Sequence, residues 1–239
     1  MEYSETNIVK GLPLEFAQEE IDKAFVLCFK NSTSQNLLLI KYKLTEMANE
    51  EPTSSVIIYW LVYCIEHLAI IYGILKETDK EEREIKEGVN LLENIQDKNS
   101  EDFALLALMG GYSIKYTNVF KISKLIEKYK EYANKALMLD KDNIRAYLAL
   151  GVFDFNTPLA YGGGKVLEIN LNIAISLKDE SSSYVPYSPK WGKNMSYIYL
   201  IRYYMKCENK DMINKYFDEA LNLYPNDRIL IELKKEFKR

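Results

Sequence analysis

One short pattern recurs at three places in the chain. It reads ALMLDKDN at residues 136–143, AISLKD at residues 174–179 and ALNLYPND at residues 220–227. The leading alanines are 38 and 46 residues apart, and internal periods of 20–50 residues are typical of repeat architectures. A fainter copy ends at residues 91–96. The spacing predicts a stack of similar units, each ending in the same way.

The segments between these copies have the apolar spacing of helices, with caps and helix breakers between them. Strict two-residue alternation, which would indicate strands, is nearly absent. Ten glycines and six prolines also leave little material for the turns of an all-β protein. The pattern predicts about ten or eleven helices, near residues 14–30, 34–49, 53–76, 79–96, 100–116, 121–139, 143–155, 165–178, 190–207, 210–223 and 227–238.

The repeated units resemble those of the tetratricopeptide-repeat (TPR) family, which are pairs of antiparallel helices. The best match is residues 194–227, with packing positions at Tyr197, Leu200, Tyr204, Ile213, Phe217, Ala220 and Pro225. The next best is residues 144–179, which carries Tyr147, Leu150, Gly151, Leu167, Leu171 and Ala174. The chain departs from the family pattern at Gly110, Tyr129, Asp154 and Ile201 and by extra residues at 158–165.

The resemblance implies an all-α fold, a right-handed superhelical solenoid of antiparallel helix pairs. We expect a single helical-repeat domain over residues 1–239. Within it, residues 1–99 form divergent pairs, residues 100–227 form clearer TPR-like units, and residues 228–239 form a C-terminal capping helix.

Composition and charge exclude several classes of function. The chain of 239 residues has 31 Lys and Arg against 35 Asp and Glu, a formal net charge of −4. This leaves no general cationic field for a phosphate backbone, so we expect no nucleic-acid partner. A single histidine excludes multi-histidine metal sites, and we expect no cofactor.

The first twenty residues and the cysteines favour a cytoplasmic protein. Residues 1–20 lack the basic start and apolar run of an export signal. Cys28, Cys64 and Cys207 are an odd number without a CxxC motif, which favours reduced, buried thiols over a disulfide framework.

The apolar run from Val56 to Leu75 raises the alternative of a membrane span. Glu66 lies near its middle and His67 follows, and both are costly in lipid. A helix buried in a protein core avoids that cost, so we expect no stable membrane insertion.

A glycine-rich stretch, NTPLAYGGGK at residues 156–165, has the appearance of a phosphate-binding loop. Leu159 stands where such a loop needs glycine, Val166 stands where it needs a hydroxyl residue, and a helix rather than a strand precedes it. We therefore interpret it as a long turn within a helix pair, whose exposed amides at the next helix start attract an anion weakly.

Cys64 and His67 are three residues apart on one apolar helix, so the thiol and the imidazole can meet and form a nucleophile–base pair. No further residue in the sequence can be named to orient the ring. The alternative interpretation, which we favour, is a core thiol beside a core histidine, so we expect no enzymatic activity.

Nineteen tyrosines are the more informative feature, because aromatics gather on the first helices of successive pairs. In TPR proteins these helices line the concave face, so aromatics that do not serve as packing wedges are expected to face a groove there. Tyrosine offers contact area and a polar tip at small entropic cost. The predicted partner-binding residues are Tyr112, Tyr116, Tyr199, Arg202 and Tyr203.

The sequence therefore predicts a non-catalytic interaction or scaffold module that binds a peptide or protein in its concave groove. The alternative is an accessory ligand-binding protein with an aromatic pocket near the glycine loop. That pocket would be formed by Tyr161, Gly162, Gly163, Gly164, Lys165 and Trp191. Self-association remains open beside either function, because terminal repeats need a polar cap.

Overall fold

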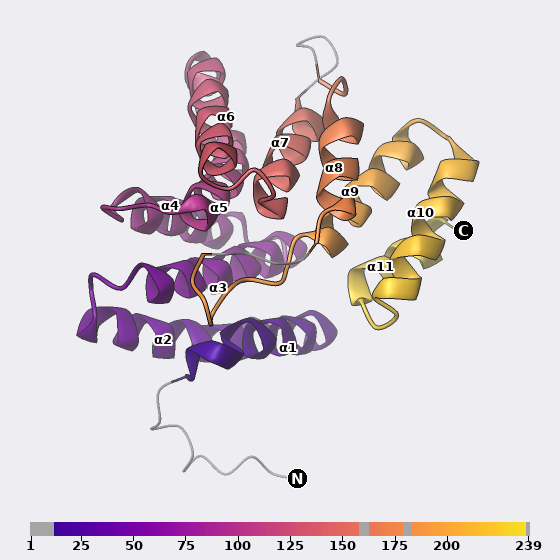
Figure 1. The fold of residues 1–239 in the computed structure, drawn as a ribbon. Coiled ribbons are helices and arrows are strands. Elements are labelled where there is room, and N and C mark those ends of the chain that lie inside the picture. Colours follow the sequence, from indigo (N-terminus) through magenta and orange to yellow (C-terminus); the bar gives the residue numbers. More distant parts are fainter. Residues whose placement is uncertain (1–11, 158–162, 179–182, 238–239) are drawn as a thin grey trace. The chain divides into compact units, whose positions relative to one another are not determined.

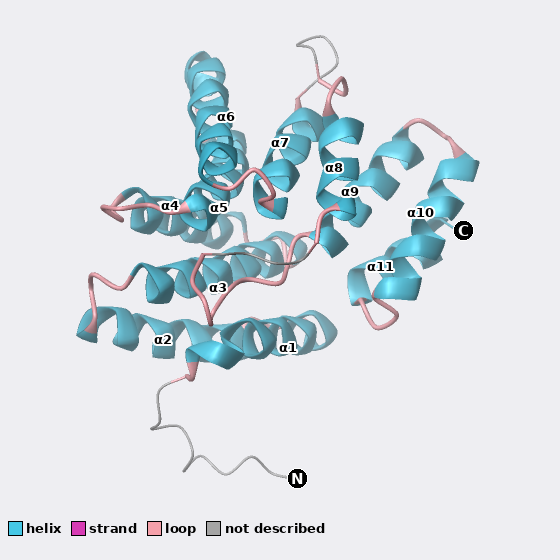
Figure 2. Ribbon diagram, in the orientation of Figure 1, coloured by secondary structure: helices cyan, strands magenta, loops and turns pink. Residues whose placement is uncertain are grey.

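Helices are the only regular secondary structure in the described part of the chain. A computed structural model describes residues 12–157, 163–178 and 183–237, and these residues contain helices and loops but no strand (Figures 1 and 2). Its α-helices are α1 (Ala17–Asn31), α2 (Gln35–Glu50), α3 (Ser55–Ile74), α4 (Thr78–Glu93), α5 (Ser100–Ser113), α6 (Ile122–Leu139), α7 (Ile144–Asn156), α8 (Leu167–Ser176), α9 (Lys193–Lys206), α10 (Lys210–Leu223) and α11 (Arg228–Phe237).

Helix periodicity and caps located these elements well. All eleven predicted helices are present, and each boundary lies within three residues of its expected place. The predicted start at residue 14 and the predicted end at residue 116 fall on short 3₁₀ helices, Leu14–Phe16 and Ile114–Tyr116, that adjoin α1 and α5. The all-α prediction is therefore confirmed.

The chain divides into two compact units, residues 1–96 and residues 97–239. In the first unit, α1 packs on α2, and both contact α3, which also packs on α4. An ion pair joins α2 to α4, since Lys41 Nζ lies 2.6 Å from Glu84 Oε2 and 2.8 Å from Glu87 Oε2.

Helix α3 is the core of this first unit. It is long and apolar enough to cross a membrane, but 78% of its most apolar window is buried inside the protein. Trp60, Cys64, Ile65 and Leu68 are all at most 1% exposed. The apolar run thus packs against neighbouring helices on most of its circumference.

The second unit is built from successive helix pairs. Helices α5 and α6, α7 and α8, and α9 and α10 pack together, and α7 also contacts both α5 and α9. Helix α6 packs on α7 and α8 on α9, so each pair rests on the next, and α11 packs on α9 and α10. The first helices of the pairs, α5, α7 and α9, contact one another in turn and form one layer, and each second helix packs against its own first helix (Figure 1).

Two glycines allow close helix crossings in this unit. A Cβ on Gly151 would lie 2.4 Å from Leu171 Cδ2, so α7 and α8 approach where the TPR pattern has glycine. A Cβ on Gly110 would lie 2.1 Å from the ring of Tyr129. Gly110 and Tyr129, two departures from the family pattern, therefore compensate for each other across the α5–α6 crossing.

Candidate partner-binding surface

The structure divides the predicted partner-binding residues into two groups. Tyr112 lies near the end of α5 and Tyr116 in the 3₁₀ turn after it, whereas Tyr199, Arg202 and Tyr203 lie on α9. Helix α7 packs against both α5 and α9. Arg202 is exposed and the four tyrosines are half-buried, so all five contribute to the surface of the first-helix layer.

The α9 group belongs to an aromatic cluster at the ends of α7 and α9. The ring of Tyr199 meets that of Phe155 edge-on, with centroids 5.3 Å apart. Tyr203 packs on Tyr204 at 5.0 Å, and Lys206 Nζ lies 3.6 Å from the Phe155 centroid. The prediction missed Phe155 and Lys206 as surface residues, although Phe155 belongs to the same run of aromatics on first helices.

Tyr204 is the buried residue on which this cluster packs. It stacks on Tyr216 of α10 at 5.6 Å. Burial and a hydrogen bond with Glu168 raise its pKa above the usual range, and burial also raises the pKa of Tyr203. Tyr204 is buried, whereas Tyr203 is half-buried and contributes to the surface. Cys207 is exposed, so the expectation that all three thiols are buried is wrong for this residue, while Cys28 and Cys64 are buried.

The described residues of the glycine loop, 163–165, lie near the C-terminal end of α7. Tyr161 and Gly162 lie outside the described residues. Gly163 is buried, and a Cβ there would lie 1.8 Å from the carbonyl oxygen of Thr157. Gly164 has a φ of 75° and its amide donates to the carbonyl of Asp154 at 3.3 Å, while Lys165 is exposed.

The amides at the start of α8 already have an anionic partner. The Asp154 carboxylate accepts from Val166 N at 2.8 Å and from Leu167 N at 2.7 Å. Helix N-termini favour negative charge, and here the chain supplies it. The expectation that these amides attract a free anion is therefore wrong.

Trp191 lies at the opposite end of α7 from the glycine loop. Its carbonyl accepts from Arg145 Nη1 at 2.8 Å, and its ring centroid is 6.0 Å from the Arg145 guanidinium carbon. Arg145 and Asp154 are separated by about 14 Å of helix at 1.5 Å per residue. The structure does not bring Trp191 together with Gly163, Gly164 and Lys165, because α7 lies between them.

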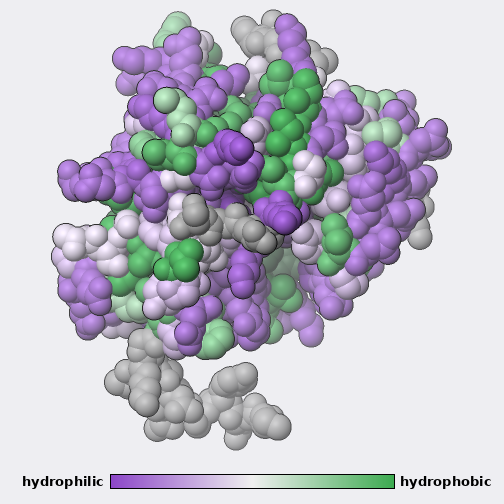
Figure 3. All heavy atoms as spheres, in the orientation of Figure 1, coloured by the Kyte–Doolittle hydropathy of each residue, from purple (hydrophilic) through white to green (hydrophobic). Residues whose placement is uncertain are grey.

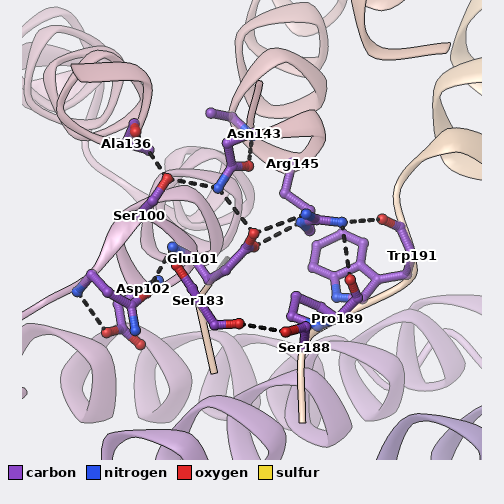
Figure 4. A network of polar contacts seen from close by, with 12 residues as sticks. Ser100, Glu101, Asp102, Ala136, Asn143, Arg145, Ser183, Ser188, Pro189 and Trp191 are labelled. Carbon is purple, nitrogen blue, oxygen red and sulfur yellow. Dashed lines mark hydrogen bonds and ion pairs between the residues drawn. The ribbon is translucent and has the colours of Figure 1, made fainter. Parts of the chain in front are cut away.

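Arg145 is the centre of a buried polar network at the N-terminal ends of α5 and α7 (Figure 4). Its Nε donates to Glu101 Oε2 at 2.7 Å and its Nη2 to Glu101 Oε1 at 2.8 Å. The two side chains are only 1% and 0% exposed. Such a buried pair is tolerated because both groups are fully hydrogen-bonded, and breaking it typically costs about 3–5 kcal/mol.

Asn143 and Ser100 extend this network to α6. Asn143 Nδ2 donates to Ser100 Oγ at 2.8 Å and to Glu101 Oε1 at 3.1 Å. Its Oδ1 accepts from Ala146 N at 2.9 Å and so caps α7, while Ser100 Oγ donates to the carbonyl of Ala136 at 2.8 Å. The asparagine that ends the first repeated motif thus joins two helix pairs.

The chain segment of residues 183–192, the connecting segment, lies against this network before α9 begins. Arg145 Nη1 also reaches the carbonyl of Pro189 at 3.5 Å, and the Tyr184 hydroxyl donates to Asp102. Ser188 Oγ donates to the carbonyl of Ser183 at 2.7 Å, which closes the segment on itself (Figure 4). The connecting segment therefore covers the N-terminal ends of α5 and α7. The aromatic cluster lies at the opposite, C-terminal end of α7 and is not part of this contact.

Cys64 and His67, expected from the sequence to be core residues rather than a nucleophile and its base, have separate partners in the first unit. Cys64 Sγ donates to the carbonyl of Leu37 at 3.5 Å, and burial raises the pKa of this thiol far above its usual range. His67 Nδ1 lies 2.9 Å from Glu66 Oε2 and 2.9 Å from the carbonyl of Tyr63. Its Nε2 is 3.6 Å from Asp22 Oδ1.

These contacts identify the groups that orient the ring, which the sequence did not. Glu66 is adjacent in the chain, and Asp22 comes from another helix, α1, where no spacing rule indicates it. A protonated thiol without the histidine as its base is not an activated nucleophile. The pair is better explained as part of the core of the first unit.

Stacked antiparallel helix pairs, with small residues at the crossings, define the class of protein as a TPR-like helical repeat. TTC0263, a thermophilic TPR protein from Thermus thermophilus, is similar in structure, with a TM-score of 0.59 and 13% identity over 93% of this chain and 100% of that one. The chain therefore has the fold that its repeated motifs predicted.

Two further solved structures are similar over most of their lengths, with lower TM-scores. YrrB, a TPR protein with an unusual peptide-binding site, has a TM-score of 0.38 and 13% identity over 92% of this chain and 93% of its own. PilF of Pseudomonas aeruginosa has a TM-score of 0.36 and 14% identity over 92% and 99%. No family model and no curated protein matches the sequence.

Proposed function

We propose that the protein is a non-catalytic interaction module that binds a peptide segment of another protein on the first-helix layer of its second unit. The proposed binding surface lies over the C-terminal halves of α7 and α9. The observation that carries the proposal is the surface cluster of Phe155, Tyr199 and Tyr203 beside the cations Arg202 and Lys206.

The connecting segment supports this location. It occupies the N-terminal ends of α5 and α7 with the chain's own carbonyls and the Tyr184 hydroxyl. We therefore place the partner segment further along the first helices. Aromatic and arginine side chains dominate binding energy at many interfaces, which suits this surface to a short segment with apolar and acidic side chains.

The space-filling view shows that apolar side chains are also exposed outside the proposed surface (Figure 3). Hydrophobic side chains gather on its visible face over α7 and α8, while hydrophilic side chains cover α10 (Figure 3). Val166 and Ile169, at the start of α8, are among the exposed hydrophobic residues of the second unit.

A selected peptide provides a direct test. A displayed peptide library is screened on the immobilised protein, and the affinity of the best peptide is measured by fluorescence anisotropy. We expect Tyr199→Ala combined with Tyr203→Ala to weaken binding by about 10-fold or more, as for a typical interface anchor.

Tyr132→Ala is the matched control. It removes a tyrosine from the second helix α6, where Tyr132 packs on Phe103, and we expect it to leave the affinity unchanged. Circular dichroism confirms helicity for each variant. Equal affinity of the folded Tyr199/Tyr203 variant and the unsubstituted protein would show that the surface is misplaced.

A further inference from the structure

The turn that joins α5 to α6 exposes two apolar side chains. Val119 is 70% exposed, and Phe120 is 93% exposed, the highest fraction among the large hydrophobic side chains of the described residues. Both belong to the short 3₁₀ helix Val119–Lys121, directly before α6, and the Asn118 side chain accepts from Phe120 N at 3.0 Å. A capped turn therefore presents two adjacent apolar side chains to solvent.

Two lysines accompany these apolar side chains. Lys121 follows Phe120 directly, Lys124 comes three residues later in α6, and both lysines are exposed. Residues three apart are neighbours on a helix, so the two ammonium groups extend from the same side of this end of α6. We refer to Val119, Phe120, Lys121 and Lys124 as the tip.

The positive charge of the tip is not balanced by acidic neighbours. Residues 103–126 contain three lysines and no acidic residue, although the whole chain has 35 Asp and Glu in 239 residues. Among the described residues, no carboxylate forms an ion pair with Lys121 or Lys124. The nearest acidic residue along the chain is Glu127, which is exposed on α6.

Exposed apolar side chains beside cations match the surface of an anionic membrane. Lysines near such a surface are attracted by the lipid headgroups, and apolar side chains enter the boundary between headgroups and acyl chains. Charges more than about 8 Å apart are largely screened at physiological ionic strength. The tip therefore responds to nearby headgroups even though the chain as a whole has a formal net charge of −4.

Soluble anionic partners fit the tip less well. The phosphate backbone of a nucleic acid pairs with lysines but has no apolar layer beneath its charges. An acidic peptide needs a groove beside its anchor residue, and a phenylalanine that is 93% exposed has almost no neighbours to form one. A bilayer needs no groove, because the apolar side chain enters the lipid.

We infer that the tip is a site of weak, reversible contact with the surface of an anionic membrane. Phe120 enters the boundary between headgroups and acyl chains, while Lys121 and Lys124 face the lipid phosphates. This contact is peripheral and leaves the apolar helix α3 buried in the first unit. The tip shares no residue with the proposed peptide-binding surface, so the two proposals are tested separately.

Co-sedimentation of the full chain with vesicles tests the proposal. We compare vesicles of phosphatidylcholine alone with vesicles that also contain phosphatidylglycerol, each at low and at high salt. We expect binding to the anionic vesicles that weakens as the salt concentration rises, and no binding to the neutral vesicles.

Charge reversal tests the role of the lysines. Lys121→Glu combined with Lys124→Glu should weaken binding to the anionic vesicles by at least about 10-fold. Glutamate is favourable near the start of a helix, so this variant keeps α6 intact, and circular dichroism checks this. Lys210→Glu combined with Lys215→Glu is the matched control, because it makes the same charge change at exposed positions of α10. We expect this control to bind as the unsubstituted protein does.

Phe120→Ser tests the role of the apolar side chain. It should weaken vesicle binding by about 5-fold or more, since less apolar surface enters the lipid. Leu223→Ser is the matched control, because Leu223 is 60% exposed on α10 and lies outside the tip. We expect this control to leave vesicle binding unchanged.

Fluorescence tests entry into the lipid. The two tryptophans of the chain, Trp60 and Trp191, are only 1% and 5% exposed. In a Phe120→Trp variant, we expect anionic vesicles to shift the emission to shorter wavelength and brominated lipid to quench it. A Leu223→Trp variant should show neither effect.

Three results would overturn the proposal. The first is an absence of binding to anionic vesicles at low salt, and the second is binding that the Lys121/Lys124 variant retains. The third is binding that needs both lysines but not Phe120. Competition by a DNA duplex or by polyglutamate would then identify a soluble polyanion as the partner of the tip.

Discussion

Asp102 joins two parts of the second unit through one carboxylate, the start of α5 and the connecting segment. Its Oδ2 accepts from Asn99 N at 3.0 Å and completes a capping box at the start of α5. Its other oxygen accepts from the Tyr184 hydroxyl of the connecting segment. Burial raises the pKa of Asp102 from its ordinary value of 3.8 to about 6, although the bonds from Tyr184 and Asn99 oppose this rise.

We expect Tyr184→Phe to raise the pKa of Asp102 further, because the substitution removes a donor that stabilises the charged form. The pKa is measured from the ¹³C chemical shift of the carboxyl group during an NMR titration. Tyr187→Phe, in the same segment, should leave the titration unchanged. An unchanged Asp102 pKa in Tyr184→Phe would mean that this hydroxyl does not hold the connecting segment on α5.

At the scale of elements, the crossing of α5 and α6 depends on a small residue and a large residue that have exchanged places relative to the TPR pattern. The TPR pattern has an aromatic at the position of Gly110 and a small residue at the position of Tyr129. Here the ring of Tyr129 fills the space that a Cβ on Gly110 would occupy. The two departures therefore preserve the packing of this pair rather than weaken it.

This exchange predicts strong coupling between the two positions. Gly110→Ala should lower the free energy of unfolding by about 1–3 kcal/mol, as for overpacked cores. Tyr129→Leu shortens the ring that causes the clash, so the double variant should be more stable than the sum of the single effects by about 0.5–3 kcal/mol. Urea unfolding of the unsubstituted protein, the two single variants and the double variant measures this coupling free energy. Strictly additive effects of the two substitutions would contradict the proposed contact between Gly110 and Tyr129.

At the scale of the whole molecule, the one histidine of the chain makes stability depend on pH. Burial by itself lowers the pKa of His67, but the charge and hydrogen bond of Glu66, together with Asp22 and the Tyr63 carbonyl, outweigh it. The net pKa is raised above the ordinary value of 6.5. Protonated His67 therefore stabilises the folded protein.

Because the pKa of His67 is higher in the folded protein than in the unfolded chain, protonation of His67 stabilises the folded state fully below the unfolded pKa of about 6.5. This stabilisation is lost as the pH rises through the folded pKa of His67. We expect the melting temperature to fall as the pH rises above about 6.5. His67→Gln should flatten this part of the profile. Differential scanning calorimetry at a series of pH values measures both. A profile of His67→Gln that parallels that of the unsubstituted protein would contradict the assignment.

The helices could be predicted from the sequence because their signals are local. The motif at residues 136–143 carries the end of α6 and the cap of α7, and Asn143 does accept from Ala146 N. Tyr197 and Leu200, expected as packing positions, are buried, and Ala220 is completely buried. Apolar spacing and caps depend on neighbours within a few residues, so they are visible in one sequence.

The environment of the surface aromatics and of the loops was harder to predict, because it is not local. Trp191 was expected beside the glycine loop, which is 27 residues earlier at Gly164, yet it lies at the opposite end of α7. The Asp154 carboxylate reaches amides 12 and 13 residues away. Nothing in the spacing of these residues indicates either contact.

The sequence alone determined that this protein is a stack of helix pairs, because the free energies of caps, turns and amphipathic spacing act along the chain. The tertiary structure decided which polar groups are paired. Arg145 and Glu101, 44 residues apart, pair only when α5 and α7 come together and exclude water. It also decided which aromatics remain at the surface, because burial depends on what the next helix covers.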